Sequence, residues 1–149
     1  MGHHRSRVLV VVALAGFVLA WLAYVRVYVP SGGEPVRYRT TAVGRLTLPR
    51  AQTEVFQTRE EWVRFFDELD VDVHAPHVDF GRDDAVLLAL GPRSTAGSFV
   101  EVERVEEQRG RVLVVAREGY APGRPAAVSY PSVVVLVRAT GKPVVVDWR

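Results

Sequence analysis

The sequence reads TREEWVRFFDEL from Thr58 to Leu69, and this segment predicts the one clearly marked helix of the chain. Thr58 and Glu61 have the spacing of a capping box, in which a hydroxyl and a carboxylate satisfy free amides at a helix start. Apolar side chains then recur at intervals of three and four residues, at Trp62, Phe65, Phe66 and Leu69. This spacing gives a single apolar stripe, which we interpret as part of a core.

The segments around this helix have the character of strands. Ala85–Leu90 is a short apolar run, and residues 100–105 alternate apolar with charged side chains, as in a half-exposed strand. A polar turn, Gln108-Arg109-Gly110, separates this segment from the apolar run Val112–Ala116. Two weaker strand candidates precede the helix, at Arg45–Leu48 and Glu54–Gln57.

The last two apolar runs are Val133–Val137 and Val144–Val146, and Thr140-Gly141-Lys142 between them indicates a second hairpin. Only one helix falls between strands, so the βαβ repetition typical of a parallel sheet is absent. We therefore predict an α+β fold, with a mainly antiparallel β-sheet and one α-helix packed on a face of that sheet.

The N-terminal segment has the features of a membrane anchor. VLVVVALAGFVLAWLAYV, residues 8–25, is 18 residues long and contains neither a charge nor a proline. As a helix it is about 27 Å long, close to the thickness of a hydrocarbon core. Arg26 can snorkel to the headgroups, which extends the apolar span to Val29. The end of the run lacks the small residues of a signal peptidase site, so we predict an uncleaved transmembrane helix.

This reading divides the chain into three parts. Residues 1–29 are predicted to form a cytoplasmic head and transmembrane anchor, residues 30–42 a linker, and residues 43–149 an extracytoplasmic domain. Basic residues flank both sides of the apolar run, but a short cationic head with Arg5 and Arg7 is the usual signal-anchor layout. We therefore expect a single-pass membrane protein whose C-terminal domain lies outside the cytoplasm.

Composition excludes several function classes. The chain has no cysteine, which rules out a disulfide framework, thiolate metal sites and a cysteine nucleophile. Its net charge of +2 belongs to the N-terminal segment, because residues 31–149 hold 16 basic and 17 acidic residues, a net charge of −1. A nucleic-acid partner requires clustered positive charge in excess, so we expect none.

A metal-dependent hydrolase is the alternative function that the residues leave open. His74, His77 and Asp79 have a spacing that can supply three zinc ligands, although a solvated loop with Pro76 explains them equally well. Neither a Gly-x-Ser-x-Gly turn nor a phosphate-binding loop is present. We therefore predict a protein with no catalytic residues, no metal and no cofactor.

Three polar loops are the remaining candidates for function, at Gly91–Ser98, Gly119–Pro125 and Ser129–Ser132. Tyrosine, arginine and backbone groups on preorganised loops are typical of protein-binding surfaces, whereas plain connecting loops are the alternative interpretation. The residues that we predict to bind a partner protein are Arg93, Ser94, Thr95, Gly97, Tyr120 and Tyr130.

The same loops and strands resemble a known family. The residues that carry the resemblance are Val78-Asp79-Phe80, Ala85–Gly91, Ser94–Gly97, Val100–Glu107, Ser129-Tyr130-Pro131 and Lys142–Val146. Together they resemble the C-terminal domain of the PrcB family, whose members are named as protease complex subunits, over roughly residues 54–149. The resemblance implies a cell-envelope protein that acts as an accessory or chaperone-like partner of a secreted protease, without a catalytic residue of its own.

The chain departs from the family pattern in two loops. The family's Thr-Gly-Gly-Tyr is Thr95-Ala96-Gly97-Ser98 here, and the aromatic residue is displaced to Phe99. The family's Thr-x-Pro step is Ser129-Tyr130-Pro131, which keeps a hydroxyl. No lipid-accepting cysteine is present, so a transmembrane helix is the expected anchor.

Overall fold

The computed structural model describes residues 33–43, 46–69 and 73–149. The predicted cytoplasmic head and anchor, residues 1–29, lie outside the described residues. Within the described part of the chain, no helix is both long and apolar enough to cross a membrane.

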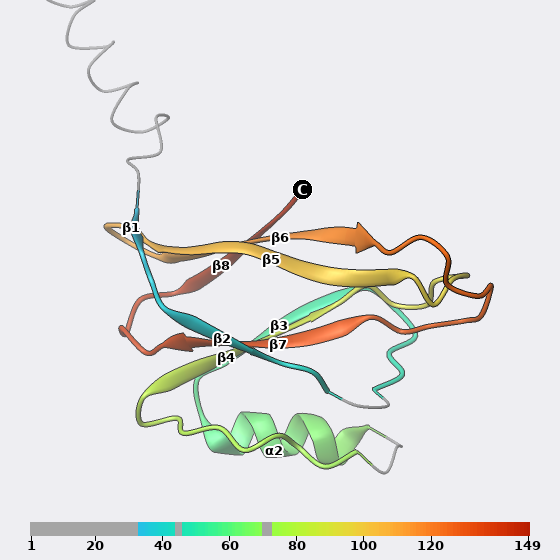
Figure 1. Ribbon diagram of the computed structural model, residues 1–149. Coiled ribbons are helices and arrows are strands. Elements are labelled where there is room, and N and C mark those ends of the chain that lie inside the picture. The colour runs from blue at the N-terminus through green and yellow to red at the C-terminus, as the bar shows by residue number, and fades with distance from the viewer. Residues whose placement is uncertain (1–32, 44–45, 70–72) are drawn as a thin grey trace, which may run out of the picture. The chain divides into compact units, whose positions relative to one another are not determined.

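The domain consists of two four-stranded sheets stacked face to face, with one helix against the outer face of the second sheet (Figure 1). Sheet A has the strand order β1 (Glu34–Pro35), β5 (Ser98–Glu107), β6 (Val112–Tyr120) and β8 (Val144–Trp148). Sheet B has the strand order β2 (Tyr38–Thr41), β7 (Ser132–Arg138), β4 (Asp83–Ala89) and β3 (Gln52–Phe56). The helix, α2, covers Arg59–Glu68.

The predicted helix and its capping box are confirmed. The Thr58 hydroxyl accepts a hydrogen bond from the amide of Glu61 at 3.2 Å, and the Glu61 carboxylate accepts one from the amide of Gln57 at 3.2 Å. Trp62 and Phe66 are buried against sheet B. The Trp62 indole also donates a 2.9 Å hydrogen bond to the carbonyl of Pro76, which ties the segment after the helix to its buried face.

We predicted a single sheet with a helix packed on one face. The helix does pack on a sheet, but the domain has two sheets, so the predicted number of sheets is wrong. On β4, Ala85 and Leu87 pack in the core below α2, whereas Val86 and Leu88 pack in a second core between the sheets. On β7, Val134 and Leu136 pack in the core beside α2, and Val135 and Val137 pack in the core between the sheets. A strand that is buried on both faces has a continuous apolar sequence, so both runs indicate a central strand between two covering layers.

The predicted hairpin between the last two strands is also wrong. Gly141 adopts a φ of 71° in the expected turn, but this turn carries the chain from sheet B to sheet A. Both edges of β7 are already taken, because β7 pairs with β2 on one side and β4 on the other. β8 therefore pairs with the free edge of β6, in parallel orientation, with Val146 beside Val114.

Residues 34–41, which we expected within the linker, belong to the folded domain. β1 pairs with the end of β5, and β2 pairs with β7, so that the chain passes from one sheet to the other between Pro35 and Tyr38. The weak strand candidate at residues 45–48 forms no strand within its described residues, 46–48. Leu46 and Leu48 are instead buried in the core beside α2.

Candidate functional site

The predicted loops meet at one end of the domain, where β4 and β6 end and β5 and β7 begin (Figure 1). The backbones of Arg93 and Ser129 exchange two hydrogen bonds, of 2.8 and 2.9 Å. The amide of Ala121 donates a 2.8 Å hydrogen bond to the carbonyl of Gly97. Residues 91–97 and 119–131 therefore form one assembly, which we call the loop cluster.

Arg93 holds the loop cluster together from within. Its guanidinium donates two hydrogen bonds to the Glu118 carboxylate, at 2.8 and 3.0 Å, and a third to the carbonyl of Leu90 at 2.7 Å. The Arg93 hydrogen bonds lower the pKa of Glu118, and the same contact raises the pKa of Arg93. The structure thus brings Arg93 to the predicted site but directs its donors inward, which makes it a brace for the loops.

Three further predicted or neighbouring residues fix the backbone of the loop cluster. The Thr95 hydroxyl accepts a hydrogen bond from the amide of Gly97 at 3.1 Å, and the Ser129 hydroxyl donates one to the carbonyl of Thr95 at 2.6 Å. Gly97 is buried where the chain passes closely by, because a Cβ there would collide with the carbonyl oxygen of Ala121. Ser94 is exposed at the tip of its loop.

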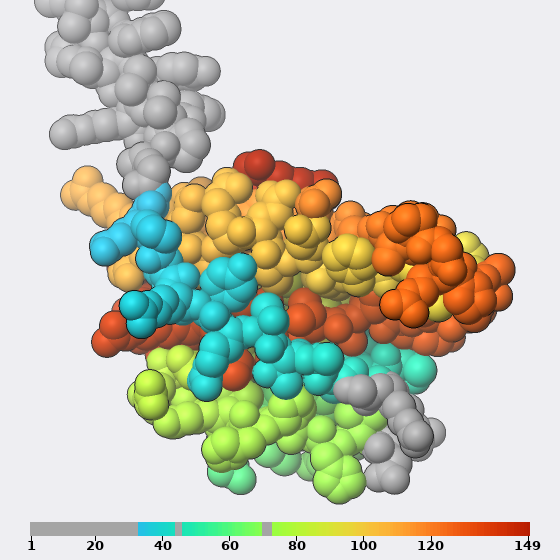
Figure 2. Space-filling model, viewed as in Figure 1, coloured from blue at the N-terminus to red at the C-terminus, as the bar shows by residue number. Residues whose placement is uncertain are grey.

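Large apolar side chains are exposed at this end of the domain. The side chains of Tyr120 and Val128 are 60% and 67% exposed, and Tyr130 is 37% exposed. Phe99 of β5 adds a fourth exposed side chain, whose ring lies over Gly119 so closely that a Cβ at that position would collide with it. Figure 2 shows the segment around residues 119–130, in orange, as a rounded projection at this end of the domain.

Sequence reasoning missed Val128 and Phe99 as site residues. Val128 lies in a segment with Pro125 and two alanines, where nothing in the sequence distinguishes a buried from an exposed valine. Phe99 occupies a strand position, and its ring lies over Gly119, the residue with which it is paired across the sheet.

The residues proposed as metal ligands do not form a metal site. Among the described residues, no group of three potential ligands lies close enough to hold an ion. The Asp79 carboxylate accepts a 3.1 Å hydrogen bond from the amide of Gly81, and its carbonyl accepts bonds from the amides of Arg82 and Asp83. Asp79 therefore forms the turn that precedes β4, which is the structural interpretation of this segment.

The acidic residues of β5 are engaged in ion pairs. Arg117 contacts Glu101 at 2.6 Å and Glu103 at 3.1 Å, and Arg104 contacts Glu106 at 2.8 Å. Alternating charges of this kind stabilise a solvated sheet surface modestly. They leave no pair of free carboxylates for acid–base chemistry on this strand.

A comparison of the chain with protein-family models, curated proteins and solved structures finds no match.

Proposed function

We propose that this chain is a membrane-anchored extracytoplasmic protein that binds another protein through the loop cluster. The observation that carries the proposal is the position of the exposed apolar side chains. Of the seven large apolar side chains that are exposed among the described residues, four are at this end, namely Phe99, Tyr120, Val128 and Tyr130. The other three are Val63 on α2, and Val145 and Trp148 on β8.

The braced backbone supports a binding role for these side chains. Association costs free energy when loops and side chains must be ordered, and a surface fixed in advance reduces that cost. The Arg93–Glu118 pair and the backbone hydrogen bonds around Gly97 and Ser129 supply this order within the free domain. Tyrosines on such a surface combine a large contact area with a hydroxyl, which is why they are frequent in binding hot spots.

The partner class that we propose is a secreted or envelope protease, with the chain as its accessory or chaperone-like subunit. This choice rests on the resemblance to the PrcB family, which passes through the loop cluster at Ser94–Gly97 and at Ser129-Tyr130-Pro131. In this chain, the exposed aromatic side chains at this end are those of Phe99, Tyr120 and Tyr130. We expect the partner to present an apolar recess that receives Tyr120 and Val128.

Site-specific photocrosslinking in native membranes tests the proposal. A photoreactive residue in place of Tyr120 or Val128 is expected to capture a peptidase, which mass spectrometry identifies. The matched control places the photoreactive residue at Val145, which is 37% exposed on β8. Val145 lies beside Leu113, near the start of β6 and away from the loop cluster. Capture of the same proteins from all three positions, or of none from the loop cluster, would disprove the binding site.

A second measurement uses the captured peptidase in purified form. Tyr120→Ser with Val128→Ser is expected to weaken its affinity for the full chain by about 100-fold, since each lost anchor costs about 1–2 kcal/mol. Val145→Ser should leave the affinity unchanged. Equal affinities of all three proteins would show that the contact lies elsewhere.

A further inference from the structure

The opposite end of sheet B carries an open pocket of about 900 Å³, which the proposed function does not use. It is formed by the start of β2, the turn before β4 and the end of β7. The charged side chains that line it are Arg37, Arg39, Arg82, Asp83 and Arg138. Four arginines therefore face a single aspartate, in a domain whose overall charge is nearly balanced.

The register of the sheet explains why these side chains gather. Arg138 of β7 lies directly beside Asp83 of β4, and Arg39 of β2 lies beside Leu136. Residues two apart on a strand share a face, so Arg39 points to the same side as Leu136 and Arg138. Arg37, one residue before β2, lines the same pocket. Leu136 belongs to the core below α2, which shows that this is the face of sheet B that the helix covers elsewhere.

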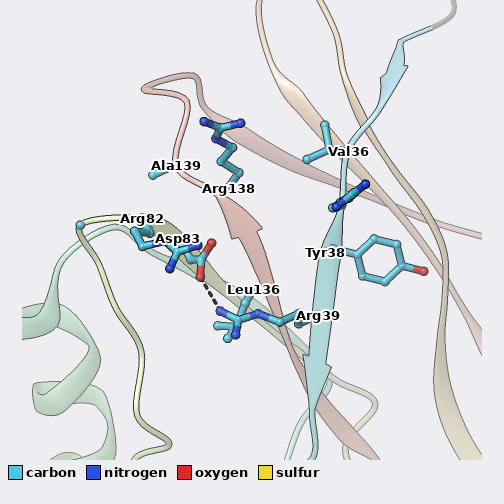
Figure 3. Close-up of a pocket in the computed structure, with 10 residues that line it drawn as sticks. Val36, Tyr38, Arg39, Arg82, Asp83, Leu136, Arg138 and Ala139 are labelled. Atoms are coloured by element: carbon cyan, nitrogen blue, oxygen red, sulfur yellow. Dashed lines mark hydrogen bonds and ion pairs between the residues drawn. The ribbon is translucent and has the colours of Figure 1, made fainter.

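Only one of the four arginines is neutralised. Arg39 reaches from β2 to the carboxylate of Asp83 at 2.6 Å, as Figure 3 shows. No hydrogen bond or ion pair engages the guanidinium of Arg37, Arg82 or Arg138 with any other described residue. The pocket therefore presents three uncompensated positive charges.

The backbone keeps two of these arginines on adjacent segments. The amide of Ala139 donates a 2.8 Å hydrogen bond to the carbonyl of Arg82, which fixes the end of β7 against the turn before β4. Figure 3 shows Arg82 and Arg138 on neighbouring segments at this end of the sheet. Holding like charges together costs free energy unless an anion occupies the space between them.

We propose that this pocket binds a phosphate-bearing anion. A guanidinium offers its donors as a planar fork that two acceptor oxygens can fill, so a single carboxylate satisfies one arginine. A phosphate group has more acceptor oxygens and can bridge several arginines at once. The pocket and the loop cluster share no residue, so this proposal is independent of partner binding at the loops, and only its lipid arm rests on the membrane anchor of the proposed function.

A phospholipid headgroup and a soluble phosphate ester are the two sources of this chemistry. The headgroup is within reach of the predicted anchor: Val36 is seven positions after Val29 in the sequence, a distance of at most about 25 Å when the chain is extended. Basic residues this near a membrane are attracted to anionic lipids. The soluble ester requires no membrane, so the two sources can be separated experimentally.

Arginine-selective labelling of the full chain with phenylglyoxal, read by mass spectrometry, is the test. One arm compares nanodiscs of phosphatidylcholine with and without phosphatidylglycerol, and the other adds glycerol phosphate to the detergent-solubilised chain at constant ionic strength. Labelling of Arg37, Arg82 and Arg138 is expected to slow about fivefold or more, either in the phosphatidylglycerol nanodiscs or with glycerol phosphate. Fivefold corresponds to about 1 kcal/mol, the attraction of one arginine to an anionic surface. Slowing in the nanodiscs alone assigns the site to a lipid headgroup, and slowing by glycerol phosphate assigns it to a soluble ester.

The exposed residues Arg50 and Arg124 are internal controls, because both lie outside the pocket, at the loop-cluster end of the domain. Their labelling should be the same under all conditions. In the variant Arg37→Gln with Arg138→Gln, the labelling rate of Arg82 should no longer respond, whereas Arg50→Gln with Arg124→Gln should preserve its response. Unchanged rates in both arms, or equal slowing at Arg50 and Arg124, would overturn the proposal.

Discussion

The two ends of sheet B use arginine in opposite ways. At the loop cluster, the Arg93 guanidinium donates to the Glu118 carboxylate and to the carbonyl of Leu90, and it thereby connects the segment after β4 to β6. At the pocket, Arg37 and Arg138 have no such partner among the described residues. The difference shows that an arginine stabilises the fold only where acceptors lie within its reach, and that elsewhere its charge is available to a ligand.

The largest expected effect is at the loop cluster, for Gly97→Ala. The added methyl group would collide with the carbonyl oxygen of Ala121, so the two segments must separate. We expect the free energy of unfolding to fall by about 2–3 kcal/mol, as for other overpacked sites. Urea denaturation of the full chain measures the change.

Gly110→Ala is the matched control for this substitution. A Cβ at Gly110, in the turn between β5 and β6, would meet no atom within 4 Å. Its effect should therefore remain within about 0.5 kcal/mol. A similar loss of stability in both variants would mean that the close approach at Gly97 is not what the loop cluster depends on.

Arg93→Gln ranks next in size. The substitution removes the four hydrogen bonds that the guanidinium donates to the Glu118 carboxylate and to the carbonyl groups of Leu90 and Pro92, and it leaves Glu118 without its guanidinium partner. Glu118 is 40% exposed, so water offsets part of the loss, and we expect a decrease of about 1–2 kcal/mol in unfolding free energy. Hydrogen exchange should become faster in residues 91–97 and remain unchanged in β2, and the reverse pattern would contradict the brace.

The two ends should also respond to acid with opposite sign. The Arg93 hydrogen bonds lower the pKa of Glu118 from its ordinary value of 4.5, so its contribution to stability is complete above pH 4.5 and is lost as the pH falls through the lowered value. Burial is the main cause that raises the pKa of Asp84, at the start of β4, from its ordinary value of 3.8. Its contribution is complete below pH 3.8 and is lost as the pH rises through the raised value.

Two variants separate these contributions in a profile of stability against pH. Glu118→Gln should flatten the loss below pH 4.5, and Asp84→Asn should remove the gain that accompanies acidification toward pH 3.8. We expect less than about 1 kcal/mol from each, because Glu118 is partly exposed and the Gln57 side chain offsets part of the shift at Asp84. Parallel profiles for the two variants would show that the ends do not differ in this respect.

The smallest effect is expected at the pocket, for Arg138→Gln. Removal of a charge that has no acidic partner other than the already paired Asp83 relieves repulsion, so stability should rise by up to about 0.5 kcal/mol. Thermal unfolding of the full chain at low ionic strength gives the sign. A loss of more than about 1 kcal/mol would show that Arg138 braces the fold as Arg93 does.

The elements that could be predicted are those with local signals. The capping box of Thr58 and Glu61 defined α2, and the polar turn at residues 108–110 defined the hairpin of β5 and β6. The division into two sheets could not be predicted in this way. It depends on which face of β4 and β7 is covered by α2 and which by sheet A. A continuous apolar run does not distinguish these two faces.

For the candidate site, the sequence indicated where the residues lie but not what each side chain does. All six loop residues lie at one end of the domain, but the sequence did not show that Arg93 points inward or that Val128 points outward. The arginine pocket escaped prediction because its parts come from β2, β4 and β7. Arg37 and Arg39, two residues apart, were a local signal, but the proline and glycine residues before them favoured a linker.

The antiparallel pairing of β2 with β7 has a mechanical consequence. β2 begins at the pocket end and runs toward the loop cluster, so a pull between the chain's N-terminal side and a partner at the loops acts along the strand. The ladder bonds are perpendicular to the strands, and all of them must stretch together rather than open one by one. The domain should therefore resist tension on this axis better than tension applied across the sheet, which an optical trap with handles at alternative positions can measure.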